Sequence, residues 1–151
     1  MKNKVKKIIS YAAFAVYALA MALLLFKRAA MPYHSINLVP FRTIAEYFGF
    51  LSNGSGMNRL AVINLGGNVG LFIPLGLFLA IIWKKLRRFL PHLLATAVII
   101  IVVELIQYIT LRGTADIDDL ILNIIGSAVG FILYTVYEKI KNHIIKKKSE
   151  K

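Results

Sequence analysis

The sequence predicts an all-α, polytopic membrane protein with four transmembrane helices, both termini in the cytoplasm and one short amphipathic helix in the first outer loop. Hydrophobic residues make up 58% of the 151 residues, and the mean hydropathy is +0.69. A soluble domain of this length has too small a core to bury so much apolar surface. Four apolar runs approach the ~20 residues that a helix needs to cross a bilayer. The length fits a single domain spanning residues 1–151.

The apolar runs cover residues 8–26, 60–83, 89–111 and 120–137. Backbone polar groups facing lipid must be paired within the segment, so we predict that each run is a helix. The last two runs are rich in Ile and Val, but their uninterrupted length favours helix over strand. Residues 41–50 place apolar and polar side chains on opposite faces at helical spacing, directly after Pro40. This pattern predicts a short helix at the outer interface, acting as a surface anchor or as a lid.

The basic residues predict the orientation. The N-terminal tail, the hinge between the second and third helices and the C-terminal tail hold fourteen of the 19 Lys and Arg residues, and the other side holds five. The richer side is predicted to be cytoplasmic. A net charge of +12 would also suit a nucleic-acid partner, but short membrane-flanking tails form no organised basic surface and instead lie against anionic headgroups. We therefore predict contact with the lipid bilayer and none with nucleic acid. The absence of cysteine excludes disulfides and thiolate metal sites.

Polar residues gather at the outer ends of the last three predicted membrane helices. Glu104 lies inside its helix, about 10 Å below the outer end at 1.5 Å per residue, and Gln107 shares its face. A carboxylate at that depth costs up to roughly 3 kcal/mol, which favours a functional role. The predicted binding site comprises Asn64, Asn68, Glu104, Gln107, Arg112, Asp116, Asp118, Asp119 and Asn123.

Several chemistries remain open for this set. Glu104, Asp116 and Asp119 offer the oxygen ligands that a divalent cation such as Mg²⁺ or Ca²⁺ prefers. Glu104 and Asp119 are also candidates for a general acid or base, although no catalytic residue is assigned. Taken singly, each residue also has a structural explanation, since aspartates cap helices and amides join them. Gly126 and Gly130 allow close helix approach, either within the chain or between copies as an oligomer.

Four motifs follow one another between residues 37 and 130. They are Asn37-Leu38-x-Pro40-Phe41; Asn64-x-x-Gly67-Asn68-x-x-x-Phe72-x-Pro74-Leu75-Gly76; Glu104-x-x-Gln107; and Arg112-Gly113-x-x-Asp116-x-Asp118-Asp119-x-x-x-Asn123-x-x-Gly126-x-x-x-Gly130. In this order they resemble the VanZ-like family of small bacterial membrane proteins. The resemblance implies a multi-pass protein of the bacterial plasma membrane, linked to resistance against glycopeptides of the teicoplanin type or to another cell-envelope function.

The polar residues predict a non-enzymatic membrane protein with an extracytoplasmic polar site. The resemblance implies that this site limits glycopeptide action at the membrane surface, by engaging the acyl chain of the drug or an envelope lipid. The alternative is a membrane-embedded enzyme acting on a lipid-linked envelope substrate, with Glu104 or Asp119 as the base and a divalent cation as cofactor. A third interpretation is a proton-linked transporter that uses Glu104. It would need several copies of the chain, because four helices enclose only a small pathway.

Overall fold

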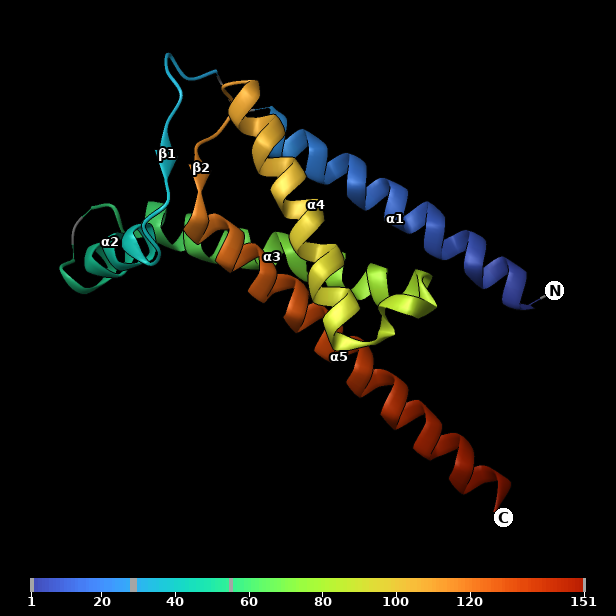
Figure 1. Cartoon of the computed structure of the whole chain (residues 1–151). Coiled ribbons are helices and arrows are strands. Elements are labelled where there is room, and N and C mark those ends of the chain that lie inside the picture. Colours follow the sequence, from blue (N-terminus) through green and yellow to red (C-terminus); the bar gives the residue numbers. More distant parts are fainter. Residues whose placement is uncertain (1, 28–29, 55, 151) are drawn as a thin grey trace.

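The computed structural model describes residues 2–27, 30–54 and 56–150, and this part of the chain folds into an open helical bundle (Figure 1). The elements in chain order are α1 (Lys2–Phe26), β1 (Ile36–Asn37), α2 (Arg42–Ser52), α3 (Asn58–Ile82), the 3₁₀ helix η1 (Lys84–Arg87), α4 (Phe89–Ile109), β2 (Ala115–Asp116) and α5 (Ile117–Ser149). Four of them, α1, α3, α4 and α5, are long and apolar enough to cross a membrane. The predicted four-helix membrane fold is confirmed.

Two helices extend further than their apolar runs. α1 begins at Lys2, and α5 runs for 33 residues to Ser149, well beyond residue 137. The sequence prediction ended each helix at the first charges, because it counted only residues suited to lipid. Lys and Glu are nonetheless good helix formers in water, and Lys141 pairs with Glu138 at i,i+3 with 2.9 Å between Nζ and Oε1. Both helices therefore continue past the apolar zone.

The tightest contact in the fold joins α3 to α5 through three glycines. A Cβ added to Gly126 would overlap the Val69 carbonyl, and one added to Gly130 would overlap the Ile73 carbonyl. Gly76 of α3 meets the Ser127 backbone of α5 in the same way. Without side chains at these points, the two backbones approach closely enough for van der Waals packing. The Gly126–Gly130 face is thus occupied by α3 of the same chain, and contact between copies remains a prediction.

α1 is packed more loosely than the other membrane helices. Of its described side chains, Met21 and Leu25 are buried, and they join a core cluster with Phe72, Leu75, Leu79 and Ile100. The Tyr17 hydroxyl donates to the Leu71 carbonyl at 2.7 Å. Pro74 lacks the N–H that would bond to the Gly70 carbonyl, so the helix ladder is interrupted one residue before this contact. α1 is therefore attached to α3 by this polar bond, by the core cluster and by the rings of Phe14 and Tyr17 against Phe78.

The connections at one end of the bundle are joined by a short parallel ladder. Ile36 pairs with Ala115 and Asn37 pairs with Asp116. The ladder draws the long segment after α1 against the turn between α4 and α5 (Figure 1). A two-residue ladder has no signature in the sequence, because it depends on tertiary contacts and not on alternating side chains. We call this end of the molecule, with α2 and the two strands, the loop end.

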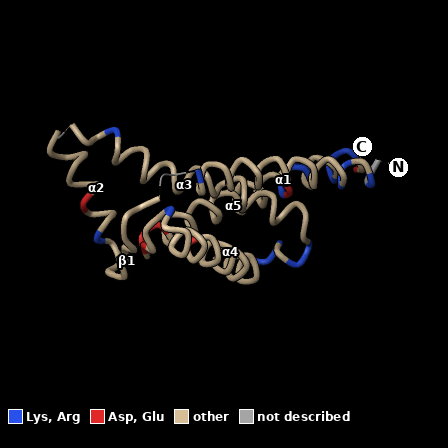
Figure 2. Tube along the Cα trace, turned by 90° about the horizontal axis from the view of Figure 1, so that it is seen from above, with Lys and Arg blue, Asp and Glu red and all other residues tan. Residues whose placement is uncertain are grey.

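Both termini and η1 lie at the other end, which we call the basic end (Figure 2). The three basic segments that the sequence places on one side of the membrane therefore do lie together. Arg28 and Lys151, which belong to the counts above, lie outside the described residues. α2 spans nearly the residues predicted for the interfacial helix, and its place at an outer interface remains a prediction, as does the cytoplasmic assignment of the basic end.

The glycine contacts predict opposite effects for two alanine substitutions. Gly126→Ala should lower the free energy of unfolding by about 1–3 kcal/mol, because the added Cβ meets a backbone carbonyl that cannot move independently. Gly70→Ala on α3 is the control, since nothing lies within 4 Å of its added Cβ. It should be neutral or stabilising by up to about 1 kcal/mol. Thermal unfolding in detergent would measure both. Equal stability of the two variants would contradict the close α3–α5 approach.

The orientation can be measured with single cysteines, because the chain contains none. Asn53→Cys follows α2 at the loop end, and Lys148→Cys lies near the C-terminus of α5. A membrane-impermeant maleimide added to intact cells should label the Asn53→Cys variant. It should label the Lys148→Cys variant only after the cells have been permeabilised. The physical reason is the excess of Lys and Arg at the basic end. The reverse labelling pattern would place the loop end in the cytoplasm.

Candidate functional site

A small polar cavity lies between α3, α4 and α5 towards the loop end. Its volume is about 10 Å³, which is room for roughly one water molecule. Its polar lining comes from Asn68, Glu104, Gln107, Thr114, Asp119 and Asn123, and its apolar lining comes from Leu25, Phe72 and Val103. Five of the nine predicted site residues therefore meet at one place. The structure brings the two carboxylates named as candidate acids or bases, Glu104 and Asp119, to the same cavity.

Two amides from different helices accompany these carboxylates. Asn68 Nδ2 of α3 donates to Asp119 Oδ1 of α5 at 2.5 Å. Asn123 lies one turn further along α5 and is 3% exposed. Its Oδ1 is buried and has no hydrogen-bond partner among the described residues. A buried amide oxygen is costly to leave unsatisfied, so it offers a place for one donor, such as a water or a polar group of a ligand.

Gln107 and Arg112 attach the end of α1 to this site. Gln107 Nε2 donates to the Leu25 carbonyl at 3.1 Å, and Arg112 Nη1 donates to the Phe26 carbonyl at 2.6 Å. The last carbonyls of a helix have no partner within the helix, so these two side chains serve as a C-terminal cap supplied by another segment. The polar residues thus position α1 over the cavity.

The turn after α4 aims Arg112 at that helix end. Leu111 adopts a left-handed conformation with φ 57, its N–H donates to Tyr108, and the Arg112 N–H donates to Gln107. This is the Schellman arrangement, in which the residue after the cap is normally glycine. A leucine in this conformation costs roughly 1 kcal/mol. The hydrogen bonds on either side offset that cost and fix the direction in which the chain leaves α4.

Asp116 does not belong to the cavity. It precedes α5 with extended backbone angles, and its Oδ1 accepts from the Asp118 N–H at 2.9 Å, which caps α5. Its Oδ1 also accepts from Asn37 Nδ2 at 3.1 Å, and its Oδ2 accepts from the Thr43 hydroxyl at 2.7 Å. One carboxylate therefore starts α5 and holds β1 and α2 in place. In the sequence, Asp116, Asp119, Asn123, Gly126 and Gly130 recur at helical spacing, which predicts one stripe along a helix. Because α5 begins at Ile117, that stripe begins at Asp119.

Asp118 is fully buried and caps the start of a different helix. Its Oδ1 accepts from the Phe41 N–H at 2.5 Å, and its Oδ2 accepts from the N–H groups of Thr43 and Ile44 at 2.8 and 3.1 Å. Phe41 is the N-cap residue of α2 and the other two donors lie in its first turn, which has no side-chain cap from Phe41 itself. The negative charge also faces the positive end of the helix dipole. Asp118 is therefore a structural residue that docks α2 onto α5.

Asn64 also lies outside the cavity, since its Nδ2 donates to the Leu60 carbonyl one turn earlier in α3. The three carboxylates proposed as metal ligands, Glu104, Asp116 and Asp119, are not gathered around one point. In the described part of the chain, no three His, Cys, Asp or Glu side chains are close enough to share a metal ion. A divalent cation at Glu104 and Asp119 would have to take its other ligands from amides and water.

Sequence reasoning missed two groups of polar residues. Thr43 helps to dock α2 through its bond to Asp116, and Thr114 lines the polar cavity. Their closeness to the motifs could have identified them, since each lies within three residues of a motif residue. Deeper in the bundle, Thr96 and His92 of α4 both contact the Ser127 hydroxyl of α5, at 2.9 and 3.2 Å. This buried trio joins two membrane helices in the manner of interhelical hydrogen bonds.

The fold and the site define a class, that of multi-pass α-helical membrane proteins with a buried polar cavity near one end of the bundle. Residues 14–138 match the VanZ/LLP1 family, and the chain belongs to that family. It is 31% identical over 144 residues to "Protein VanZ" of Enterococcus faecium, a match that covers 90% of this chain and 80% of that protein. The family match begins at residue 14 and so includes about half of α1, which carries none of the four motifs. No solved structure matches the chain.

The α2 contact predicts a specific effect of removing the Asp118 charge. Asp118→Asn should destabilise the docked loop end by about 2–4 kcal/mol, because an amide cannot accept from donors on both sides and leaves backbone N–H groups unpaired. Hydrogen exchange should then become faster at residues 41–44. Glu46→Gln is the matched control, since it removes the same charge from an exposed position of α2. Unchanged exchange in Asp118→Asn would show that the cap contributes little.

Proposed function

We propose that this protein contributes to glycopeptide resistance, or to a related envelope function, by binding the acyl chain of a lipoglycopeptide or envelope lipid beside the polar cavity at the outer membrane face. The proposed class of activity is binding, and the proposed location is the bacterial plasma membrane. One observation carries this proposal. The polar cavity shares three lining residues, Leu25, Phe72 and Val103, with a larger apolar cavity.

The apolar cavity has the dimensions and chemistry of an acyl-chain site. Its volume is about 320 Å³, at the lower end of the range for ligand sites. Its lining is drawn from three membrane helices, with Ala18 and Ala22 on α1, Leu75 on α3 and Ile99 on α4. A flexible hydrocarbon chain can enter such a cavity from the surrounding lipid without crossing water. The loosely packed α1 forms one wall of it.

The polar cavity gives the proposed site its second chemical part. It is too small for a sugar, a peptide or a phosphate headgroup, but it fits one water or one polar group of a larger ligand. The unsatisfied Asn123 oxygen and the two carboxylates favour a hydrogen-bond donor there. A ligand with an acyl chain and a donor near its attachment point would occupy both cavities together.

The similarity to Protein VanZ supports the link to glycopeptides. A membrane protein that binds the acyl chain of such a drug would limit its action at the membrane surface. The same two cavities would also bind an envelope lipid, because they contact only the acyl chain and one hydrogen-bond donor of a ligand and not the rest of the molecule. The drug and the lipid are therefore two possible occupants of one proposed site.

Filling the apolar cavity should abolish the proposed protection. In Ala22→Phe the added ring occupies space that the acyl chain needs, which should weaken acyl-chain binding by about tenfold or more. In a susceptible bacterial host, the minimal inhibitory concentration of an acylated glycopeptide should fall to that of cells lacking the protein. A glycopeptide without an acyl chain should show no difference between wild type and variant. Glu104→Gln and Asp119→Asn form a second arm, in which susceptibility should rise at normal membrane abundance.

Ala20→Phe is the matched control, because Ala20 lies on the same helix, is exposed and does not line the cavity. It should protect as well as the wild type. Membrane abundance is measured for every variant by immunoblot, so that loss of the protein is distinguished from loss of binding. Equal protection by Ala22→Phe and wild type at equal abundance would contradict an acyl-chain site under α1.

An enzymatic function is the second candidate, and the shared cavity of Glu104 and Asp119 is the observation that favours it. Purified protein incubated with lipid-linked precursors, with Mg²⁺ or with chelator, tests it directly. Turnover that is lost in both Glu104→Gln and Asp119→Asn would make the cavity an active site. Absence of turnover would leave binding as the proposed activity.

A further inference from the structure

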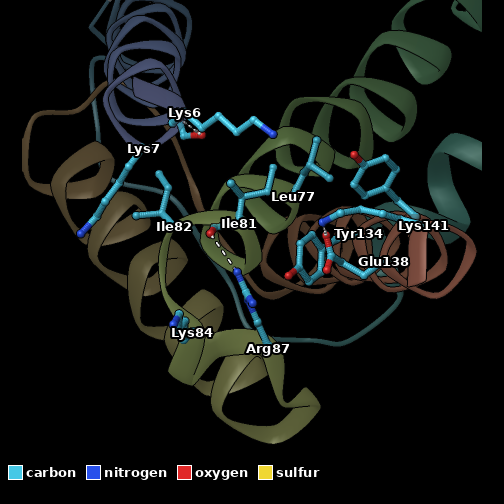
Figure 3. Close-up of a pocket in the computed structure, with 12 residues that line it drawn as sticks. Lys6, Lys7, Leu77, Ile81, Ile82, Lys84, Arg87, Tyr134, Glu138 and Lys141 are labelled. Atoms are coloured by element: carbon cyan, nitrogen blue, oxygen red, sulfur yellow. Dashed lines mark hydrogen bonds and ion pairs between the residues drawn. The ribbon is translucent and has the colours of Figure 1, made fainter. Parts of the chain in front are cut away.

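A third cavity, at the opposite end of the molecule from the polar cavity, is lined by basic residues (Figure 3). Its volume is about 820 Å³, and it lies at the basic end between α1, α3, η1 and α5. Five cationic side chains line it, Lys6, Lys7, Lys84, Arg87 and Lys141, together with one carboxylate, Glu138. None of these residues belongs to the proposed acyl-chain site.

The charge of this cavity is strongly unbalanced. Glu138 pairs with Lys141 at 2.9 Å, and the other four cations have no ion pair among the described residues. Like charges gathered around one space repel each other, and the repulsion is stronger where the wall is apolar and water is partly excluded. A bound anion removes that repulsion. The cavity therefore has the electrostatic character of an anion site.

Arg87 is held in position before any ligand arrives. Its Nε donates to the Ala80 carbonyl at 3.1 Å, its Nη2 donates to the Ile81 carbonyl at 3.4 Å, and its guanidinium lies over the Tyr134 ring at 5.4 Å. These contacts use two of the five guanidinium N–H groups. A pre-positioned guanidinium loses less conformational entropy when it binds a phosphate. Lys6 and Lys141 reach the cavity from two other helices (Figure 3).

Part of the cavity lining is apolar. Leu77, Ile81 and Ile82 of α3 and the rings of Tyr134 and Tyr137 line it together with the charged groups. The apolar span of α3 ends at Ile82, and the basic 3₁₀ helix η1 follows at Lys84. A free inorganic anion would use only the charged groups. A lipid would place its phosphate at the charged groups and its glycerol and upper acyl carbons against the apolar ones.

We propose that this cavity binds an anionic phospholipid, with the headgroup phosphate held by Arg87, Lys6 and Lys141 and the acyl chains descending along α3. Basic cavities between membrane helices at a cytoplasmic face are suited to such headgroups. The bound lipid would join α1 to α5 at the basic end, where Lys6 and Lys141 face one cavity across α3. The site does not depend on the function proposed for the loop end.

Native mass spectrometry of the full chain in a nonionic detergent tests the proposal. Phosphatidylglycerol should bind the wild type as one retained lipid, and phosphatidylcholine should bind far more weakly. Lys6→Gln/Lys141→Gln should weaken phosphatidylglycerol binding by about fivefold for each charge removed. Both lysines are exposed on helix surfaces, so the variant should fold. Lys147→Gln/Lys148→Gln is the matched control, which removes two charges from the same end outside the cavity and should retain binding.

Glu138→Gln gives a test of opposite sign. Glu138 is the only carboxylate among the described residues that line the cavity, and its removal should tighten phosphatidylglycerol binding severalfold. Equal losses in the two double variants would show diffuse attraction to the basic end and would overturn the proposal. Equal binding of the two lipids would also overturn it. Displacement of phosphatidylglycerol by millimolar inorganic phosphate would assign the cavity to a free anion and reject the lipid.

Discussion

The close backbone contact between α3 and α5 is the constraint on which the rest of the structure depends. Because Gly126 and Gly130 admit the carbonyls of Val69 and Ile73, the two helices have one register along their length. In that register Asn68 meets Asp119. A shift of one turn would move these side chains about 5.4 Å apart and separate the cavity lining. The close approach at Gly76, Gly126 and Gly130 therefore fixes which side chains of α3 and α5 meet, both in the apolar interior and in the polar cavity.

The acidic residues at the start of α5 divide into two roles because successive helical positions point about 100° apart. Asp118 faces α2 and is fully buried against three backbone N–H groups, whereas Asp119 faces α3 and lines the cavity. Asp116, just before the helix, caps it and binds Thr43. Asp116 and Asp118 therefore hold the loop end together, whereas Glu104 and Asp119 line the polar cavity, where Asp119 also accepts from Asn68.

Much of the fold follows from the sequence, and the site follows in part. Length and hydropathy are sufficient for four membrane helices, and the spacing from Asp119 to Gly130 correctly predicts one face of α5. The same spacing suggests that Asp116 shares that face, which it does not, because the chain is extended there. Asp118 shows the limit most clearly. A single sequence does not reveal that its partners lie 74 to 77 residues earlier in the chain, since that pairing depends on loop docking and not on any local pattern.

The attachment of α1 explains why the apolar cavity lies where it does. Polar bonds from Gln107 and Arg112 fix the last carbonyls of α1, and its buried side chains, Met21 and Leu25, are close to that fixed end. Towards the basic end, α1 buries none of its described side chains, although the rings of Tyr11 and Phe14 contact Phe78 and Trp83. A helix held by its end carbonyls can tilt at little cost in buried area, since it buries little. The wall of the cavity is therefore its least constrained part, which suits a site that admits a flexible hydrocarbon chain from lipid.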